Sequence, residues 1–241
     1  MGIADNVNKV RENVEKAAAR AGRSAESITL VAVSKQKPIE SIVAAYEAGL
    51  RVFGENRAHE LAQKSAELTH LPNIDWHFIG QLQTRQSLPV ATHATTFHAV
   101  DRLKIAKRLS RQLESLDRTL SVFIEVNVSG EASKAGFDCR QWEESLTQQQ
   151  ALTAAAATIA ALPRIEVQGL MTMAPWGSAE NEIRTVFQRT RALAEWLTAS
   201  VPQANWSQLS MGMTDDYHIA IEEGATHIRV GRAIFGERSY H

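Results

Sequence analysis

Short runs of apolar and β-branched residues alternate along the chain with longer segments in which apolar residues recur every three or four positions. The runs predict β-strands, and the longer segments predict amphipathic helices. Eight strands are predicted, at residues 28–35, 51–55, 75–80, 96–100, 121–128, 165–173, 206–211 and 227–231. Seven helices are predicted between them, at about 39–49, 57–68, 83–90, 102–115, 140–161, 179–199 and 215–223. A further helix at about 4–21 precedes the first strand and ends before a stop signal at Gly22.

Eight strands separated by seven helices, with a further helix at the front, are typical of a closed (β/α)8 barrel, the TIM barrel. A doubly wound open sheet shows the same alternation but seldom uses eight strands so evenly. The glutamine- and alanine-rich segment at 148–161 contains good helix formers and predicts a surface helix rather than a linker. We therefore expect an α/β fold, with one (β/α)8 domain spanning residues 1–241 and an extra helix at its N-terminus.

Composition and charge remove several classes of function. The 241 residues carry a net charge of −1 with no long block of either sign, which disfavours nucleic acid or an anionic membrane surface as a partner. The single cysteine, Cys139, excludes an intrachain disulfide and disfavours a cysteine-built metal site. The sequence contains neither an apolar run of about 18 residues nor a basic, apolar leader. We expect a cytoplasmic protein without a bound metal and, since no heptad or long apolar stripe argues for assembly, a monomer.

The first predicted strand ends in a single amine, that of Lys35. In a barrel of this kind the functional groups gather where the carboxyl ends of the strands meet. A lysine at such a position either reaches into solvent or lies in a protected site. The second case is what a Schiff-base lysine needs, because only the neutral amine attacks a carbonyl. Lys37 is expected to point to solvent, although a second amine nearby would help to keep the first one neutral.

Other strand ends leave alternatives open. The second strand is followed by Asn56, which can donate and accept hydrogen bonds at one place but can equally cap the next helix. The third contains His77 between two aromatic residues, a position more typical of a hydrogen-bonded core histidine than of a ligand or a base. The sixth ends in Met171 and Met173, whose thioethers would form a soft apolar wall.

The turns after the last two strands have the composition of a phosphate site. Residues 210–216, SMGMTDD, join a strand to a helix through a small, hydroxyl-rich turn whose backbone amides can bind phosphate. An ordinary capped turn would have a similar sequence. Gly231 offers another close amide after the eighth strand, between Arg229 and Arg232. As strand residues these two arginines would face opposite sides, so only one of them would point into the barrel mouth.

A lysine on the first strand, combined with a phosphate site at the last two, resembles the pyridoxal phosphate (PLP) homeostasis proteins. These are one-domain barrels similar to the N-terminal domain of alanine racemase. The resemblance rests on eight motifs that follow the family's order and together cover nearly the whole chain. They are AVSK at 32–35, FGEN at 53–56, WHFIGxLQ at 76–83, VDRL at 100–103, VNVSGExSKxG at 126–136, GLMTM at 169–173, SMGM at 210–213 and VGxAIFG at 230–236.

The resemblance implies a cofactor, PLP, and a role for each matching residue. Lys35 would form the Schiff base with the cofactor, Arg229 would approach its pyridine nitrogen, and Asn56 would lie near its phenolic oxygen. A guanidinium gives up its proton reluctantly, so the ring nitrogen would stay unprotonated and PLP would be a weaker electron sink. The phosphate would be lined by residues of the two turns, namely Ser210, Gly212, Met213, Gly231 and Arg232.

The sequence departs from the family pattern at three places. Residues 84–86, Thr-Arg-Gln, stand where the family usually has a small residue, Asn and Lys, so the role of that lysine is open and only Arg85 keeps a positive charge nearby. Arg232 stands where Thr is usual, and it either reaches the phosphate or points outward and leaves only the Gly231 amide. Thr214 replaces a frequent serine and keeps its hydroxyl.

Three functions remain open. The resemblance implies a PLP storage and delivery protein that serves apo PLP-dependent enzymes without catalytic turnover, and no catalytic residue is assigned. The alternative is a PLP-dependent racemase or related enzyme acting on amino acids. Racemases supply an opposite-face tyrosine base from a second domain that we expect to be absent here, and none of Tyr46, Tyr217 and Tyr240 is placed obviously as that base. A cofactor-free aldolase-type lyase, the third function, would carry its lysine on the sixth strand rather than the first.

Overall fold

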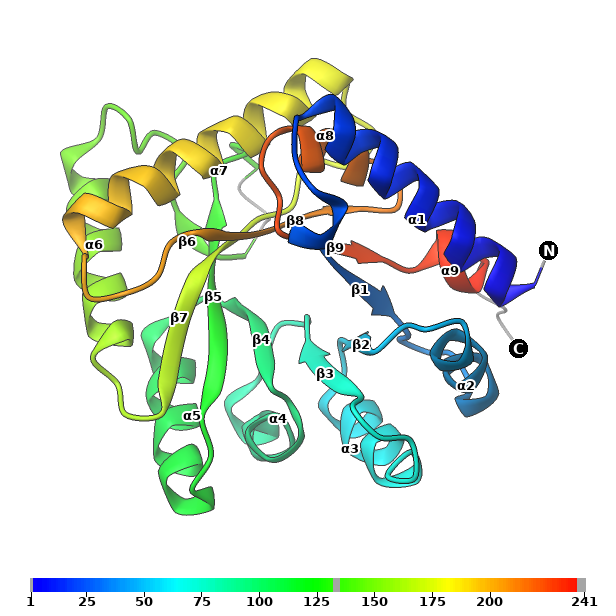
Figure 1. The fold of residues 1–241 in the computed structure, drawn as a ribbon. Helices are drawn as coiled ribbons and strands as arrows, with labels where there is room; N and C mark the ends of the chain where they lie inside the picture. The colour runs from blue at the N-terminus through cyan, green and yellow to red at the C-terminus, as the bar shows by residue number, and fades with distance from the viewer. Residues whose placement is uncertain (1, 132–134, 238–241) are drawn as a thin grey trace.

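The computed structural model describes residues 2–131 and 135–237 and forms a barrel of parallel strands surrounded by helices (Figure 1). The barrel strands are β1 (Thr29–Val33), β2 (Val52–Glu55), β3 (Asp75–Phe78), β4 (Thr96–Val100), β5 (Leu120–Asn127), β7 (Ile165–Met171), β8 (Gln208–Met213) and β9 (His227–Val230). Their hydrogen-bonded order is β4-β3-β2-β1-β9-β8-β7-β5, and pairing of β4 with β5 closes the ring. The predicted (β/α)8 fold is confirmed, since every predicted strand has its counterpart in this barrel.

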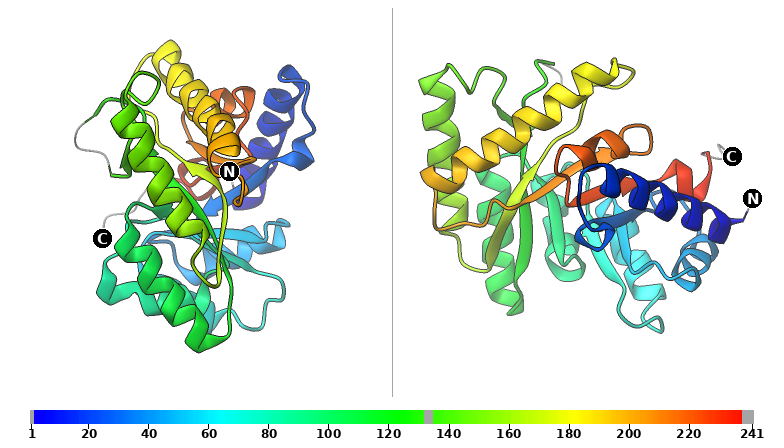
Figure 2. Two further views of the ribbon diagram at one scale, coloured as in Figure 1. Left: turned by 90° about the vertical axis from the view of Figure 1, so that its left-hand side faces the viewer. Right: turned by 45° about the horizontal axis from the view of Figure 1, so that its top comes forward.

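Helices follow the strands on the outside of the barrel. They are α2 (Ile39–Glu47), α3 (Ala58–Glu67), α4 (Ser87–His93), α5 (Leu103–Leu116), α6 (Leu146–Ala160), α7 (Glu180–Ser200), α8 (Tyr217–Glu222) and α9 (Arg232–Phe235). The predicted N-terminal helix is α1 (Ile3–Arg20), which lies along α8 and α9 (Figures 1 and 2). The Asn6 side chain joins α1 to α9 by donating a hydrogen bond to the carbonyl oxygen of Ile234 at 3.0 Å.

The structure differs from the sequence prediction in short segments. The helix predicted from residue 140 begins only at Leu146, where the Ser145 side chain caps it. A short strand, β6 (Phe137–Asp138), precedes it and pairs with the end of β5. The helix predicted at 83–90 is a 3-10 turn at Thr84–Gln86 followed by α4, because Pro89 suits the first turn of a helix and not its interior. The helix α9 was not predicted, since four residues are too few to show a period.

The barrel interior contains polar side chains beside its apolar ones. His98, from β4, is wholly buried and stacks on the ring of Phe123 with the ring centres 4.7 Å apart. It also contacts His77 and Ser210 at hydrogen-bond distance, and Ser210 in turn contacts Arg229. His77 is 3% exposed, so its prediction as a hydrogen-bonded core histidine is confirmed. No helix in the described ranges is long and apolar enough to cross a membrane.

Candidate functional site

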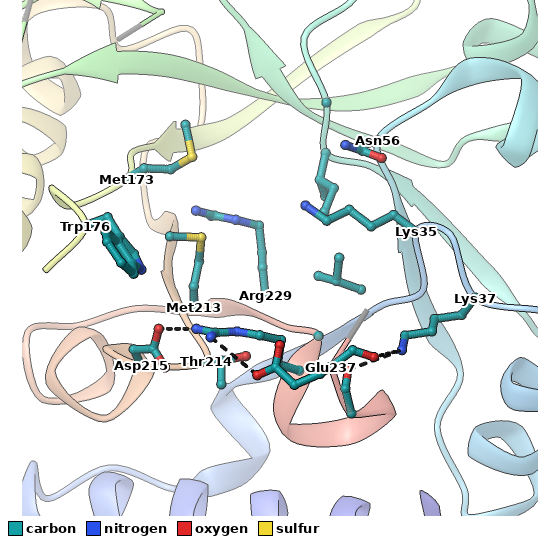
Figure 3. A pocket seen from close by; sticks show the side chains of 16 residues that line it. Lys35, Lys37, Asn56, Met173, Trp176, Met213, Thr214, Asp215, Arg229 and Glu237 are labelled. Carbon is teal, nitrogen blue, oxygen red and sulfur yellow. Dashed lines mark hydrogen bonds and ion pairs between the residues drawn. The ribbon is translucent and has the colours of Figure 1, made fainter. Parts of the chain in front are cut away.

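A cavity of about 600 Å³ opens at the carboxyl ends of the barrel strands (Figure 3). Its walls come from the ends of β1, β8 and β9 and from the segments that follow β1, β2, β3, β7, β8 and β9. Most of the residues predicted for the site line this cavity, namely Lys35, Asn56, Met213, Arg229, Gly231 and Arg232. The fold therefore brings together residues that are nearly 200 positions apart in the sequence, at the end of the barrel where the strand ends were expected to meet.

Lys35 projects into the cavity from the loop just after β1 (Figure 3). The backbone on both sides of it is fixed by hydrogen bonds. The amide of Ser34 donates to the Gly54 carbonyl oxygen at 3.0 Å, and the amide of Gln36 donates to Glu60 Oε2 at 2.8 Å. Gln36 has a φ of +59°, a conformation that a residue other than glycine adopts only with local support. The lysine is thus presented from a rigid turn.

A buried ion pair lies directly behind this turn. Lys64 Nζ donates to Glu55 Oε1 at 2.8 Å, to the Ser34 carbonyl oxygen at 2.9 Å and to Glu60 Oε2 at 3.2 Å. Burial raises the pKa of Glu55, while the charge of Lys64 and the hydrogen bonds from Lys64 and Ser34 act in the opposite direction. This pair was not predicted. Its only signal in the sequence is a glutamate at the last position of an otherwise apolar strand.

Lys37 was predicted to point into solvent, but it bonds to the protein instead. Its Nζ donates to the carbonyl oxygens of Phe235, Gly236 and Glu237 at 3.0, 3.2 and 2.9 Å. Because Gly236 and Glu237 also line the cavity, Lys37 ties the segment after α9 to the loop that carries Lys35 (Figure 3).

Arg229 reaches the cavity from β9 and is itself only 6% exposed. Its Nη1 donates to Ser210 Oγ at 2.6 Å, and its Nη2 donates to the Thr172 carbonyl oxygen at 3.0 Å. Burial lowers the pKa of this guanidinium to about 10, which still leaves it a cation at neutral pH. Two of the five N–H groups of an arginine are thereby committed to the protein, which fixes the orientation of the group in the cavity.

Two residues predicted to line a phosphate, Ser210 and Gly212, lie behind the cavity wall. Ser210 is wholly buried, and its hydroxyl group faces Arg229 inside the barrel. Gly212 has a φ of +94°, and a Cβ there would stand 2.6 Å from the Cβ of Ala220. Glycine is therefore needed for α8 to approach the end of β8. Both residues shape the turn without facing the cavity.

The remaining residues of the two turns do reach the cavity. Met213 lines the cavity, although its backbone N–H donates a hydrogen bond to Asp216 Oδ1 at 2.5 Å. Gly231 packs closely on β1, since a Cβ there would stand 3.3 Å from the Val33 carbonyl oxygen. The absence of a side chain at Gly231 leaves the backbone of this turn open toward the cavity.

Arg232 is not a strand residue, because β9 ends at Val230 and Arg232 is the first residue of α9. The alternation of strand side chains therefore does not apply, and both Arg229 and Arg232 line the cavity. The Arg232 guanidinium forms an ion pair with Asp215 and approaches Glu237 Oε1 at 3.8 Å. Because the Arg232 side chain lines the cavity and is 46% exposed, it lies at the rim.

Asn56 lines the cavity beside Lys35 and does not cap the following helix (Figure 3). Helix α3 begins at Ala58 with Arg57 as its N-cap, and no side chain accepts a hydrogen bond there. The Oδ1 atom of Asn56 is buried and has no hydrogen-bond partner in the part of the chain that the structure describes. The Asn56 backbone is held by the close approach of Gly80, where a Cβ would stand 2.3 Å from the Asn56 carbonyl oxygen.

The sequence did not decide whether several other residues face the cavity. Met173 and Thr214 line the cavity, as does Trp176, which was not predicted and is 86% exposed. Arg85 is exposed and does not line the cavity. Tyr217 is buried and does not line the cavity, so no tyrosine of the described residues faces the cavity. Three residues quoted above, Ser133, Lys134 and Tyr240, lie outside the described residues.

Comparison with known proteins agrees with this arrangement. The family model of the alanine racemase N-terminal domain matches residues 6–239. The pyridoxal phosphate homeostasis protein of Pseudomonas aeruginosa is 43% identical over 99% of this chain and 96% of its own length. The protein of the same name from Escherichia coli K12 is 40% identical over 99% of this chain and 97% of its own length.

Solved structures give the same result. PipY of Synechococcus elongatus, with PLP bound, is 35% identical, with a TM-score of 0.83 over 97% of this chain and 100% of that chain. An alanine racemase from Clostridium difficile, 13% identical, shares the fold with a TM-score of 0.68 over 99% of this chain and 56% of its own. Sequence and structure thus agree over essentially the whole barrel, and the chain belongs to the pyridoxal phosphate homeostasis protein family, whose barrel is that of the alanine racemase N-terminal domain.

Proposed function

We propose that this chain binds pyridoxal 5'-phosphate, holds it as a Schiff base on Lys35, and stores and delivers it without catalytic turnover. The observation that carries the proposal is the convergence of Lys35 and two arginines, Arg229 and Arg232, on a single cavity. The second amine that lines this cavity, that of Lys37, donates to backbone carbonyl oxygens. An amine suits the aldehyde of PLP, and cations suit its phosphate and its ring nitrogen. The names of the relatives and the PLP-bound PipY structure support the same ligand.

The lining residues fit the remaining groups of PLP. Asn56 lines the cavity, where its side-chain Nδ2 group is suited to donate to the phenolic oxygen, while its Oδ1 is buried and has no partner among the described residues. Gly231 leaves the backbone of its turn open for a phosphate, and Arg232 stands at the rim beside it. In this proposal Met213 contributes its position in the wall, since its amide is already occupied by Asp216. Ser210 and Gly212 act from behind by shaping the turn and anchoring Arg229.

Arg229 favours storage over turnover. Its pKa of about 10 keeps it a cation, and a guanidinium donates a hydrogen bond to a ring nitrogen without transferring its proton. An unprotonated ring nitrogen makes PLP a weaker electron sink. Racemisation also needs a base on each face of the α-carbon, and no tyrosine of the described residues lines the cavity. A racemase or a related amino-acid enzyme therefore remains the alternative, without an observation in its favour.

The experiment that tests the proposal is an absorption spectrum of the purified protein before and after addition of PLP. We expect a yellow protein with a Schiff-base band. Borohydride reduction followed by peptide mapping is expected to find the pyridoxyl group on Lys35, and Lys35→Ala is expected to lose that site. Lys37→Ala is the matched control, since its amine is engaged by backbone carbonyls. A colourless protein that takes up no PLP refutes the proposal.

Two further measurements separate storage from turnover. Incubation with an apo PLP-dependent enzyme is expected to activate that enzyme, whereas incubation with free amino acids is expected to give no product. Turnover of an amino acid without cofactor transfer would favour the racemase alternative. We further propose that the protein is cytoplasmic and monomeric, and that its partners are apo PLP-dependent enzymes. Size-exclusion chromatography with and without such an enzyme would test the oligomeric state and the partnership.

The role of Arg229 has its own test. Arg229→Glu is expected to alter the absorption of bound PLP and its reactivity, because the charge next to the ring nitrogen is reversed. Arg229→Lys retains a cation and is expected to stay closer to the wild-type spectrum. If Arg229→Glu leaves the spectrum unchanged, Arg229 does not contact the ring nitrogen.

A further inference from the structure

A continuous row of polar side chains crosses the interior of the barrel from the cavity to the opposite end. It begins at Arg229, whose Nη1 lies 2.6 Å from Ser210 Oγ. Ser210 Oγ lies 2.7 Å from His98 Nδ1, and His98 Nε2 lies 2.9 Å from His77 Nδ1. His77 Nε2 lies 3.2 Å from Asp75 Oδ2. We call these five residues the relay. Asp75 is the first residue of β3, so the relay ends at the amino-terminal edge of the barrel.

When both histidines are neutral, the chemistry of the two end groups fixes every hydrogen in the relay. A guanidinium only donates, so Ser210 Oγ accepts from Arg229. A carboxylate only accepts, so His77 carries its proton on Nε2 and accepts at Nδ1. His98 must then donate from Nε2 and accept at Nδ1, where the Ser210 hydroxyl donates. One arrangement with two neutral histidines satisfies all four contacts.

Burial and the surrounding charges keep the middle of the relay neutral. His98 is wholly buried, and burial lowers its pKa well below the usual value. The positive charge of Arg229 acts in the same direction, as protonation of the neighbouring His77 or His227 would. His227 packs against both relay histidines, with ring centres 6.1 Å from His77 and 5.8 Å from His98, and its own pKa is lowered to about 3 by burial. His227 bonds to Thr226 and not to the relay.

We propose that His98 and His77 are positioning residues of the PLP site, which hold the Ser210 hydroxyl in the orientation that accepts from Arg229 and thereby fix the arginine at the ring nitrogen. The inference rests on the proposed PLP function for the identity of the ligand. It assigns a role to two histidines that do not line the cavity. Without an acceptor at His98 Nδ1, the Ser210 hydrogen would have no partner in the relay, and the hydroxyl would turn away from its present orientation.

The arrangement of hydrogens can be tested on the protein without PLP. Nitrogen-15 NMR of the histidine rings distinguishes the two neutral tautomers from each other and from imidazolium. Both His77 and His98 are expected to carry the proton on Nε2, with His98 unchanged from about pH 5.5 to pH 8. Signals are assigned with His77→Gln and His98→Asn. A proton on His98 Nδ1, or titration of His98 in that range, overturns the inference regardless of whether PLP binds.

The effect on the site is tested with a matched pair of variants. In His98→Asn, the Oδ1 atom can replace Nδ1 as the acceptor for Ser210, whereas His98→Leu offers no acceptor. Loss of one buried hydrogen bond predicts that His98→Leu weakens PLP binding about five- to tenfold and shifts its absorption, while His98→Asn stays near the wild type. His227→Gln is the control, because it changes a histidine of the same layer outside the relay. If His98→Leu does not fold, Ser210→Ala replaces it with the same expected effect.

The outcomes separate this inference from the proposed function. A wild-type protein that does not bind PLP refutes the function, whatever the tautomers are. A wild-type protein that binds PLP, together with a folded His98→Leu variant of unchanged affinity and spectrum, refutes the positioning role alone. Equal losses of PLP affinity in His98→Leu and His98→Asn also refute the positioning role, since that result is expected if His98 only packs in the core.

Discussion

Replacement of Lys64 by methionine is the sharpest test of how the protein supports Lys35. The Lys64 ammonium bonds to Glu55 Oε1 at 2.8 Å and to the Ser34 carbonyl oxygen at 2.9 Å, and both partners are wholly buried. Methionine keeps most of the length of the side chain and removes the charge. The substitution therefore leaves a buried carboxylate without its cation, directly behind the loop that carries Lys35.

The expected loss of unfolding free energy follows from the response of lowest free energy, which is protonation of Glu55. Burial already raises the pKa of Glu55 with Lys64 present, so without Lys64 we expect the carboxyl to be neutral in the folded protein. At pH 7, taking a proton onto a group whose ordinary pKa is 4.5 costs about 3.4 kcal/mol, at about 1.36 kcal/mol for each pH unit. The Ser34 carbonyl loses a hydrogen bond worth about 1 kcal/mol. The sum, about 4 kcal/mol, agrees with the usual range of about 3–5 kcal/mol for breaking a buried pair.

The pH dependence of this cost distinguishes the mechanism from loss of packing. Because protonation becomes cheaper as the pH falls, the destabilisation should drop by about 2 kcal/mol between pH 7 and pH 5.5. The assay is urea denaturation of wild type and Lys64→Met at both pH values, with Lys107→Met as an exposed control on α5. The double variant Glu55→Gln, Lys64→Met is expected to lose the pH dependence. A cost below about 1 kcal/mol at pH 7, or one that is equal at the two pH values, would show that the pair is not coupled as described.

Two other residues give independent predictions. Burial, together with the charge of Asp101, raises the pKa of Glu125 from 4.5 to about 7, so the folded state favours the protonated carboxyl and wild-type stability falls as the pH rises from about 4.5 to above 7. Glu125→Gln is expected to remove this slope and to be the more stable protein at pH 8, by up to about 3 kcal/mol in urea denaturation, whereas parallel pH profiles would contradict the assignment. Gly212→Ala places a Cβ 2.6 Å from Ala220 at a φ of +94°, so we expect it to lower the melting temperature and to weaken PLP binding. Gly177→Ala is the control: Gly177 has a φ of +75° and nothing within 4 Å of a Cβ, so this substitution introduces backbone strain without a steric clash.

The sequence predicted the barrel well because each strand is a short apolar run and each loop carries its own turn signal. It also placed Lys35, Asn56 and Arg229 together, since the carboxyl ends of parallel strands have to meet at one end of a barrel. Arg232 shows the limit of this reasoning. Its expected orientation assumed that the alternation of strand side chains continues to residue 232, whereas β9 ends at Val230 and Arg232 begins α9.

The polar contacts inside the barrel could not be predicted from the pattern. Ser210 reads as part of a phosphate-binding turn, yet its hydroxyl group turns inward to Arg229 and His98. Such a contact joins strands that are more than 100 residues apart in the chain, and neither periodicity nor propensity carries information about the facing partner. Lys37 was misjudged for the same reason, since its acceptors lie about 200 residues further along.

The pairing of β9 with β1 has a consequence for the order of events during synthesis. Lys35 is made early, but β1 gains one of its two neighbouring strands only when β9 pairs with it, and Arg229, Gly231 and Arg232 come from that same last part of the chain. Lys37 then fastens to the carbonyls that follow α9. A nascent chain or a fragment that stops before His227 would therefore carry the lysine without the cavity around it. Cofactor capture has to follow completion of the polypeptide and cannot assist its early folding.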